Sequence, residues 1–169
     1  MDNQQKNPAG TRENLMSAFA GESQANRKYT AFAKKAEAEG KKNAAKLFRA
    51  AADAETVHAL REFELAGHVN STAENLAAAK AGETYEYREM YPEFLQKAQE
   101  EGNKAAALIF TYAMKAEEVH ARLYQEALDA LDEEGEVEYY LCPVCGNIER
   151  VRTERCPICG TPGDRFVKY

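Results

Sequence analysis

The sequence predicts an all-α four-helix bundle followed by a small domain built around four cysteines. Residues 11–134 are rich in Ala, Glu, Lys and Leu and have helical periodicity. After Gly135 this periodicity stops, and strand-forming residues, Pro and Gly become frequent. All four cysteines lie in this last part, which we take as a second domain over residues 137–169. Residues 1–10 are polar and are expected to form a mobile tail.

Glycines mark the expected ends of the helices. The first helix is expected to run from an N-cap at Thr11 to about Glu39. The other long helices are expected at about 43–66, 83–101 and 103–131, with a kink at Pro92 in the third. The connection between the second and third helices is long. Within it, Ser71-Thr72-Ala73-Glu74 has the pattern of a capping box for a short extra helix that ends at about Lys80.

The helical part contains an internal repeat. After a shift of 61 residues, Gly21-Glu22 matches Gly82-Glu83. After a shift of 62 residues, Glu55, Val57 and His58 match Glu117, Val119 and His120. Each half is therefore one helical hairpin, and two hairpins joined by a long crossover form a four-helix bundle with pseudo-twofold symmetry.

The repeat duplicates acidic residues at core-facing positions. Burying several carboxylates together is unfavourable unless positive charge lies among them, and two metal ions would supply it. Glu-x-x-His spacing places both side chains on one helix face. A single such pair is more often a solvated pair, but its presence at both equivalent positions favours a metal site. The inward-facing groups are Glu22, Glu55, His58, Glu83, Glu86, Glu117 and His120, whereas Glu118 and His68 are expected at the surface.

The cysteines form two copies of C-P-x-C-G, which begin at Cys142 and Cys156. Each C-x-x-C brings two thiolates to one metal ion, and the following glycine permits a tight turn. A tetrahedral site of Cys142, Cys145, Cys156 and Cys159 suits either zinc or iron. A zinc ribbon that only stabilises the tail is the alternative. The neighbouring redox-capable site favours iron, because zinc carries no electrons.

Composition and charge exclude several classes of protein. The net charge of −6 argues against a surface for nucleic acids or anionic membranes, which need clustered Lys and Arg. No apolar run approaches the roughly 20 residues that cross a bilayer. The N-terminus lacks the apolar core of a secretion signal. Because paired C-x-x-C motifs usually bind metal in a reducing compartment, we expect a cytoplasmic protein.

Over nearly its whole length the chain resembles rubrerythrin. The resemblance implies an all-α ferritin-like four-helix bundle with a small C-terminal rubredoxin-like, β-rich domain that binds iron through four cysteines. Glu86 and the cysteine tail separate this pattern from ferritins and bacterioferritins. The motifs that carry the resemblance are Ala20-Gly21-Glu22-Ser23, Glu55-Thr56-Val57-His58, Gly82-Glu83-Thr84-Tyr85-Glu86, Met90-Tyr91-Pro92, Glu117-Glu118-Val119-His120 and the paired C-P-x-C-G sequences.

The resemblance also implies a role for each ligand of a di-iron site. Glu55 and Glu117 would bridge the two irons, Glu22 and Glu86 would bind one, and Glu83 and His120 would bind the other. His58 would replace Glu86 when the site is reduced. Tyr29 and Tyr91 match tyrosines that hydrogen-bond the site carboxylates, with core packing as their alternative role. One departure is the cysteine domain, which is shortened because only ten residues separate Cys145 from Cys156.

The implied activity is the reduction of hydrogen peroxide to water by a non-haem di-iron peroxidase. Electrons would come one at a time through one iron in the four-cysteine site, from an electron-donor reductase or rubredoxin fed by NAD(P)H. Iron oxidation and storage, as in ferritins, is one alternative. A redox or metal sensor that contacts a partner through its tail is another.

A dimer is expected from distances along the fourth helix. Beyond Glu117 and His120 this helix continues to about Leu131, which carries the chain roughly 15–20 Å past the metals. The linker that follows is short, so the cysteine domain is not expected to fold back beside its own ligands. A head-to-tail homodimer, with electrons crossing between subunits, would solve this problem. The sequence leaves open whether helices are exchanged between protomers.

Overall fold

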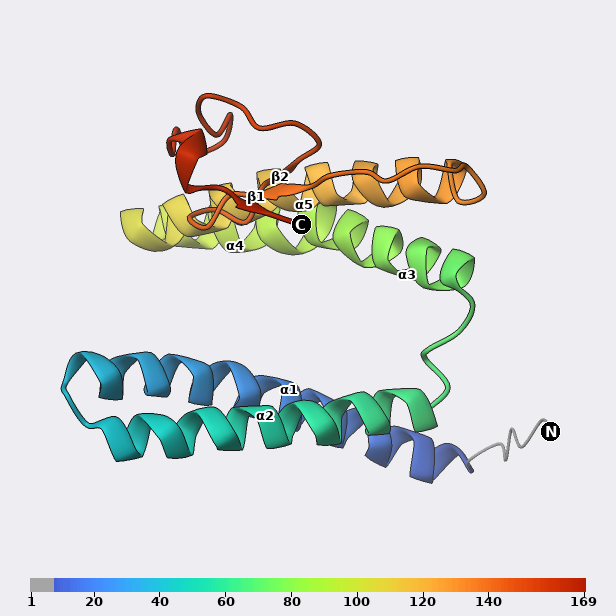
Figure 1. Cartoon of the computed structure of the whole chain (residues 1–169), viewed down its shortest axis with the longest axis vertical. Helices are drawn as coiled ribbons and strands as arrows, with labels where there is room; N and C mark the ends of the chain where they lie inside the picture. The colour runs from blue at the N-terminus through green and yellow to red at the C-terminus, as the bar shows by residue number, and fades with distance from the viewer. Residues whose placement is uncertain (1–7) are drawn as a thin grey trace. The chain divides into compact units, whose positions relative to one another are not determined.

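The computed structural model describes residues 8–169. The described chain divides into two compact units, one ending at Asn70 and one beginning at Ser71. We describe each unit by itself. The first is a helical hairpin, and the second contains the remaining helices and the cysteine domain (Figure 1). The predicted class, four helices followed by a small cysteine domain, is confirmed.

The first unit consists of α1 (Ala9–Ala38) and α2 (Lys42–Leu65), joined by a turn in which Gly40 has a φ of +71°. The predicted N-cap at Thr11 is wrong, because α1 begins two residues earlier, after Pro8. Pro8 is itself the N-cap, with an extended ψ of 150°, and its carbonyl oxygen accepts a bond of 3.0 Å from the backbone N–H of Arg12. Most of the expected tail, residues 1–7, lies outside the described residues.

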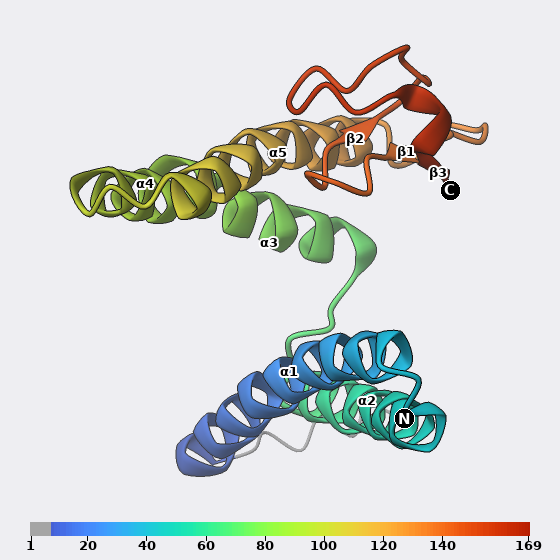
Figure 2. The same cartoon turned by 90° about the vertical axis from the view of Figure 1, so that its left-hand side faces the viewer.

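Small side chains let α1 and α2 pack closely (Figure 2). The buried amide of Asn26 on α1 links the two helices, since it donates to the carbonyl of Ala52 and to the hydroxyl of Thr56, each at 2.7 Å. The rings of Phe19 and Phe63 stack at 4.6 Å. The buried alanines of the hairpin are Ala33, Ala36, Ala45, Ala52 and Ala59.

In the second unit, the third helix begins much earlier than predicted. The segments α3 (Thr72–Tyr85), η1 (Glu86–Met90) and α4 (Tyr91–Glu100) follow one another without a break. The capping box at Ser71 is confirmed, but it starts this whole helical run rather than a separate short helix. The expected break before Glu83 does not occur, because one glycine inside a helix costs only about 0.5–1 kcal/mol.

The segment η1 is a π-helical turn just before Pro92, which lies in the first turn of α4. Proline cannot donate the usual bond to the carbonyl four residues earlier. The wider π turn absorbs this missing bond within a continuous helix, and such turns are frequent at functional sites. Its first residue is Glu86.

The last helix is α5 (Lys104–Asp129), whose N-cap Asn103 accepts a bond from the backbone N–H of Ala106. It packs along α3 and α4. After it comes a three-stranded antiparallel sheet in the order β2-β1-β3, with Tyr140 opposite both Glu149 and Lys168. The strands are β1 (Tyr140–Leu141), β2 (Ile148–Glu149) and β3 (Val167–Lys168), and a 3₁₀ turn, η2 (Gly163–Arg165), precedes β3.

The cysteine domain lies against α5 of its own chain, so the expectation that it cannot fold back is wrong. Figure 1 shows the segment after α5 returning along that helix to β1. Arg150 of the cysteine domain pairs with Glu126 on α5 at 3.3 Å. Residues 130–139 reach at most about 33–36 Å when extended. The way back from Asp129 to the level of His120 is only about 14 Å, so the linker is long enough.

Across residues 8–169, none of the helices combines the length and the apolar character that a bilayer-spanning segment requires.

Candidate metal centres

The first ligand group is Glu22 from α1 with Glu55 and His58 from α2. One ligand atom from each of the three lies within 4.8 Å of the others. Glu55 and His58 are one helical turn apart, and Oε2 of Glu55 lies 3.2 Å from Nδ1 of His58. The Asn26 amide fixes α1 against α2 at Ala52, one turn before Thr56, and at Thr56, which lies between Glu55 and His58 in the sequence. The hairpin alone therefore assembles three of the predicted ligands.

The carboxylates of this group repel one another. The hydrogen bond that Glu22 shares with Glu55 raises the pKa of the Glu22 carboxyl, and burial and the Glu55 charge raise it further. A proton shared between two carboxylates reduces the repulsion between their negative charges. A metal cation bound at the same place would reduce it in the same way. The group thus fits a metal ion that prefers carboxylate and imidazole ligands.

Glu62 is a further carboxylate beside the first ligand group that sequence analysis did not assign. Its negative charge is the last of the contributions that raise the pKa of the Glu22 carboxyl. Its Oε2 atom is buried and has no hydrogen-bond partner. The signal was present in the sequence, since Glu62 lies four residues after His58 and hence on the same face of α2.

The second ligand group is Glu83 from α3 with Glu117 and His120 from α5. Their ligand atoms also lie within 4.8 Å of one another. Nδ1 of His120 is 2.7 Å from Oε2 of Glu117 and 4.0 Å from Oε1 of Glu83. All three side chains are largely covered, with exposed fractions of 17–22%. This group is thus the counterpart of the first, as the repeat predicts.

Burial has strong electrostatic consequences for the second ligand group. It raises the pKa of Glu83 to about 7, with a further contribution from the charge of Glu117. Burial alone would lower the pKa of His120, but its bonds to Glu117 and Gly146 and the nearby carboxylates raise it overall. A protonated imidazole among carboxylates supplies the positive charge that the site requires. A metal ion bound there would supply the same charge and fits this donor set.

Three residues surround the second ligand group. Burial raises the pKa values of Glu86, Tyr91 and Tyr124, and the negative charge of Glu117 raises them further. All three therefore lie close to these carboxylates, although Glu86 lies outside the 4.8 Å group. Sequence analysis did not assign Tyr124 a role, although it lies four residues after His120. The other predicted tyrosine, Tyr29, packs in the first unit against two phenylalanine rings.

The four cysteines form a compact sulfur cluster. All four Sγ atoms lie within 4.8 Å of one another and none is in a disulfide. In each C-P-x-C-G turn the glycine N–H bonds back to the carbonyl of the first cysteine, at 3.0 Å for Gly146 and 2.9 Å for Gly160. Both glycines have positive φ values, at +82° and +74°. Four thiols at this separation fit one tetrahedral metal ion.

A single hydrogen bond joins the second ligand group to the cysteine domain. Nε2 of His120 donates to the backbone carbonyl oxygen of Gly146 at 2.9 Å. This bond fixes the ring so that Nδ1 faces the carboxylates, as is usual for a metal-binding histidine. The two partners are 26 residues apart and one is a backbone atom, so no sequence pattern could have identified the pair.

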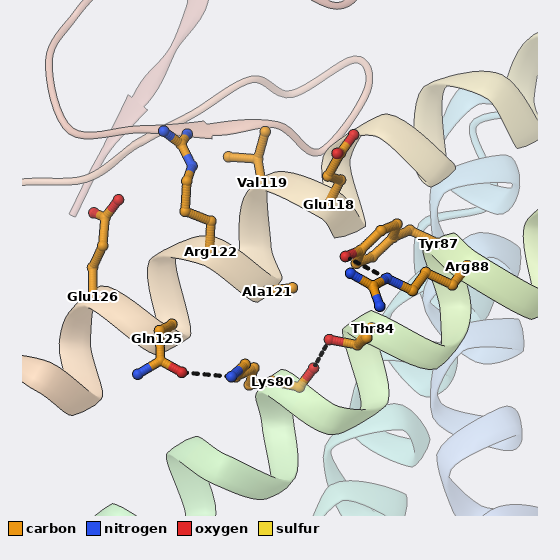
Figure 3. Close-up of a pocket in the computed structure, with 10 residues that line it drawn as sticks. All are labelled: Lys80, Thr84, Tyr87, Arg88, Glu118, Val119, Ala121, Arg122, Gln125 and Glu126. Atoms are coloured by element: carbon orange, nitrogen blue, oxygen red, sulfur yellow. Dashed lines mark hydrogen bonds between the residues drawn. The ribbon is translucent and has the colours of Figure 1, made fainter.

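Two cavities of the second unit help to place these groups. A cavity of about 670 Å³ between α3, η1 and α5 contains Glu118, Arg122 and Lys80 but none of the predicted ligands (Figure 3). Glu118 is exposed, as predicted from the sequence. A second cavity, of about 410 Å³, lies between α5 and the cysteine domain and is lined by His120, Tyr124 and mostly apolar side chains.

His68, which was expected at the surface, is half-buried in the first unit, where its ring stacks on the ring of Phe63.

Among characterised proteins, the chain is 42% identical to nigerythrin from Nitratidesulfovibrio vulgaris, over 94% of this chain and 86% of the relative. It is 36% identical to rubrerythrin-2 from Clostridium acetobutylicum, over 95% of this chain and 97% of the relative. It is 37% identical to a rubrerythrin from Porphyromonas gingivalis, over 92% and 88% of the two chains.

Solved structures agree with these relatives. The structure of fully reduced, all-ferrous nigerythrin matches with a TM-score of 0.59 and 41% identity, and the match covers 100% of this chain and 92% of that one. The mixed-valence state of nigerythrin matches with a TM-score of 0.58 at 41% identity, over 100% and 91%. The family model described as rubrerythrin matches residues 13–128. This chain therefore belongs to the rubrerythrin family, which combines a di-iron carboxylate site with a rubredoxin-like site of four cysteines.

Proposed function

We propose that the two ligand groups share one di-iron centre at which hydrogen peroxide is reduced to water, and that electrons reach it through iron in the four-cysteine site. The observation that carries the proposal is the hydrogen bond from His120 to Gly146, because it joins the two candidate metal centres. Iron storage alone would have no use for such a link.

The overall reaction consumes one peroxide, two electrons and two protons and forms two water molecules. Iron in the carboxylate site would supply the two electrons that cleave the O–O bond, and iron in the four-cysteine site would restore them singly. The proposed ligands are those expected from the sequence, with Glu55 and Glu117 as bridges and His58 as the alternate of Glu86. Glu62 adds an unassigned carboxylate beside them.

The side chains around the second ligand group are suited to supplying protons. Raised pKa values keep the hydroxyl groups of Tyr91 and Tyr124 protonated. These hydroxyls can therefore donate hydrogen bonds to a bound peroxide or to a carboxylate. The cavity beside His120 and Tyr124 offers a route for so small a substrate.

The electron route would be short and would lie within one chain. Gly146 follows Cys145 directly, so only one residue of backbone separates that sulfur ligand from the carbonyl that His120 binds. The external donor would be a reductase fed by NAD(P)H, or a rubredoxin, acting on the cysteine domain. The cysteine domain exposes about half of the apolar side chain of Val144, the residue directly before Cys145, which such a donor could contact.

The test is a turnover assay with iron-loaded protein, hydrogen peroxide and a reductant that reduces the four-cysteine site. The oxidised protein should be red, bleach with the reductant and recolour with peroxide. A protein with zinc in the four-cysteine site should keep its carboxylate irons but lose steady-state turnover. Iron-loaded protein that oxidises and accumulates added Fe(II) while leaving peroxide unreduced would instead support iron storage.

A further inference from the structure

The cavity of about 670 Å³ between α3, η1 and α5 contains none of the proposed metal ligands, yet it gathers charged side chains. Three cations line it, Lys80 from α3, Arg88 from η1 and Arg122 from α5 (Figure 3). The chain as a whole has a net charge of −6, so this local concentration of positive charge runs against the overall balance. A concave surface lined by charges of one sign attracts small ions of the other sign.

Neutral groups hold two of these cations in place. Nζ of Lys80 donates to Oε1 of Gln125 at 2.5 Å, a bond that joins α3 to α5 across the cavity (Figure 3). Nε of Arg88 donates to the hydroxyl oxygen of Tyr87 at 2.9 Å, and the guanidinium carbon lies 5.4 Å from the centre of that ring. A neutral partner orients a cation without cancelling its charge. Both cations therefore keep their charge available for an anion.

The charges along the cavity wall do not cancel. Two carboxylates, those of Glu118 and Glu126, also line it. Glu126 is paired with Arg150 of the cysteine domain at 3.3 Å. Arg122 forms no ion pair with any residue from 8 to 169. Three cations thus stand against one carboxylate that is not already paired, and the difference is an excess of two positive charges.

A phosphate monoester matches this excess, because its phosphate group carries about −1.5 to −2 charges at pH 7. Arginine binds phosphate through two parallel N–H bonds, and lysine adds a compact positive charge. A cavity of about 670 Å³ lies within the range of sites for small organic molecules, roughly 300–1,000 Å³, so it has room for more than the phosphate. The side chains of Val119 and Ala121 and the ring of Tyr87 offer an apolar wall for the organic part.

We propose that this cavity binds a nucleotide. The phosphate lies among Lys80, Arg88 and Arg122, and the nucleoside part packs against Val119 and Tyr87. The site is separate from the candidate metal centres and does not depend on the reaction proposed for them.

The cavity lies beside a helical turn that carries one of the proposed iron ligands. Tyr87 and Arg88, which line the cavity, directly follow Glu86 in η1. Consecutive side chains of a helix point to different sides, so one turn presents Glu86 to the metal site and its neighbours to the cavity. A phosphate that bridges Arg88 and Arg122 connects η1 to α5. Bound nucleotide therefore restrains the turn from which Glu86 projects.

Calorimetric titration of the full-length, iron-loaded protein tests the site with three probes: adenosine monophosphate, inorganic phosphate and adenosine. Adenosine monophosphate should bind most tightly. Inorganic phosphate should bind about tenfold or more weakly, because it leaves the apolar wall uncovered, and uncharged adenosine should give no measurable binding. No binding of adenosine monophosphate at millimolar concentration would overturn the proposal. Equal affinities for the nucleotide and for inorganic phosphate would overturn the assignment of the organic part.

Variants of exposed residues on α5 test the role of charge without disturbing the core. Arg122→Gln should weaken the binding of adenosine monophosphate by about tenfold, because a charge-assisted bond is lost. Glu118→Gln removes the unpaired carboxylate and should strengthen binding by about threefold. Lys115→Gln, which removes an exposed cation of the same helix outside the cavity, is the matched control and should keep the native affinity. Native affinity in Arg122→Gln, or weaker binding in Glu118→Gln, would contradict the proposed site.

Hydrogen exchange gives a second readout. Saturating adenosine monophosphate should slow the exchange of backbone amides in η1 in the native protein but not in Arg122→Gln, since the bridge to α5 is then missing. Unchanged exchange in the native protein would overturn the bridge between Arg88 and Arg122. Neither measurement uses peroxide, so the nucleotide site and the proposed peroxidase function can fail independently of each other.

Discussion

The imidazole of His120 donates a hydrogen bond of 2.9 Å to the carbonyl oxygen of Gly146, so one side chain lies in one candidate metal centre and touches the turn that forms the other. This contact predicts how damage to one cysteine turn will affect the reaction. Gly146 and Gly160 hold equivalent positions, with similar positive φ values, but only Gly146 meets the histidine.

We predict that Gly146→Ala and Gly160→Ala destabilise the cysteine domain by similar amounts, about 1–2 kcal/mol, because each forces a side chain into the left-handed region. Only Gly146→Ala should also slow the oxidation of the reduced four-cysteine iron by peroxide, by about tenfold or more, since it displaces the carbonyl. Stopped-flow absorbance would measure this rate. Equal rates in both variants would show that the contact is not part of the electron route.

Metal-free protein should lose stability as the pH rises between about 4.5 and 7. The pKa of Glu83 is raised to about 7 in the folded protein, so over this range the folded state binds more protons than the unfolded state. Stability is therefore greatest below the unfolded pKa and decreases as Glu83 ionises. Thermal unfolding followed by circular dichroism would show this slope.

Glu83→Gln should flatten the pH slope, because the amide does not ionise. Glu93→Gln is a matched control on an exposed part of the same helical run and should keep the native slope. Saturation with a divalent metal should reverse the trend, because metal binding requires the carboxylates to be ionised. A metal-free stability that increases from pH 4.5 to 7 would contradict the assignment.

Glu86→Ala should leave a folded helical unit that still binds metal, because the other proposed ligands remain. Turnover should nevertheless fall by about tenfold or more, since this carboxylate lies beside Glu117 and is the proposed alternate of His58. Iron content and steady-state peroxide reduction would be measured together. Glu118→Ala, on the opposite, exposed side of α5, should be nearly neutral. Native turnover in Glu86→Ala would mean that Glu86 is a spare carboxylate.

Gly163→Ala should disrupt the cysteine domain while leaving the helices folded. A Cβ atom at Gly163 would lie 1.8 Å from the carbonyl oxygen of Thr153, so the backbone would have to move. The visible absorbance of the four-cysteine iron should be lost at a lower temperature than in the native protein. Gly82→Ala, where no atom lies within 4 Å, should instead be neutral or stabilise α3 by about 0.5–1 kcal/mol.

The sequence alone identified both ligand groups and the sulfur cluster. The reason is that these depend on local spacing. Glu-x-x-His places two ligands on one turn of any helix, and C-P-x-C-G closes the same turn wherever it occurs. The internal repeat then showed that Glu22 and Glu83 hold equivalent positions. The sequence of one hairpin alone would not have shown this. The ends of α1, α2 and α4 followed from Gly40, Gly67 and Gly102, and the start of α3 followed from the capping box at Ser71.

Helical continuity and contacts between distant residues required the tertiary structure. The sequence suggested a break before Glu83, but packing along α5 keeps the helix intact from Thr72 through the π turn. The carboxylate of Glu62 and the hydroxyl of Tyr124 gained their significance only when their surroundings were known.

The position of the cysteine domain shows the same limit. Counting residues along α5 gave the distance from the ligands to the helix end, but not the direction that the linker takes afterwards. That direction is set by contacts such as Arg150 with Glu126 and His120 with Gly146, whose partners are 24 and 26 residues apart. Spacing in a sequence determines which side chains share a turn. Only the folded chain determines which turns meet, because that depends on the sum of many weak contacts between distant residues.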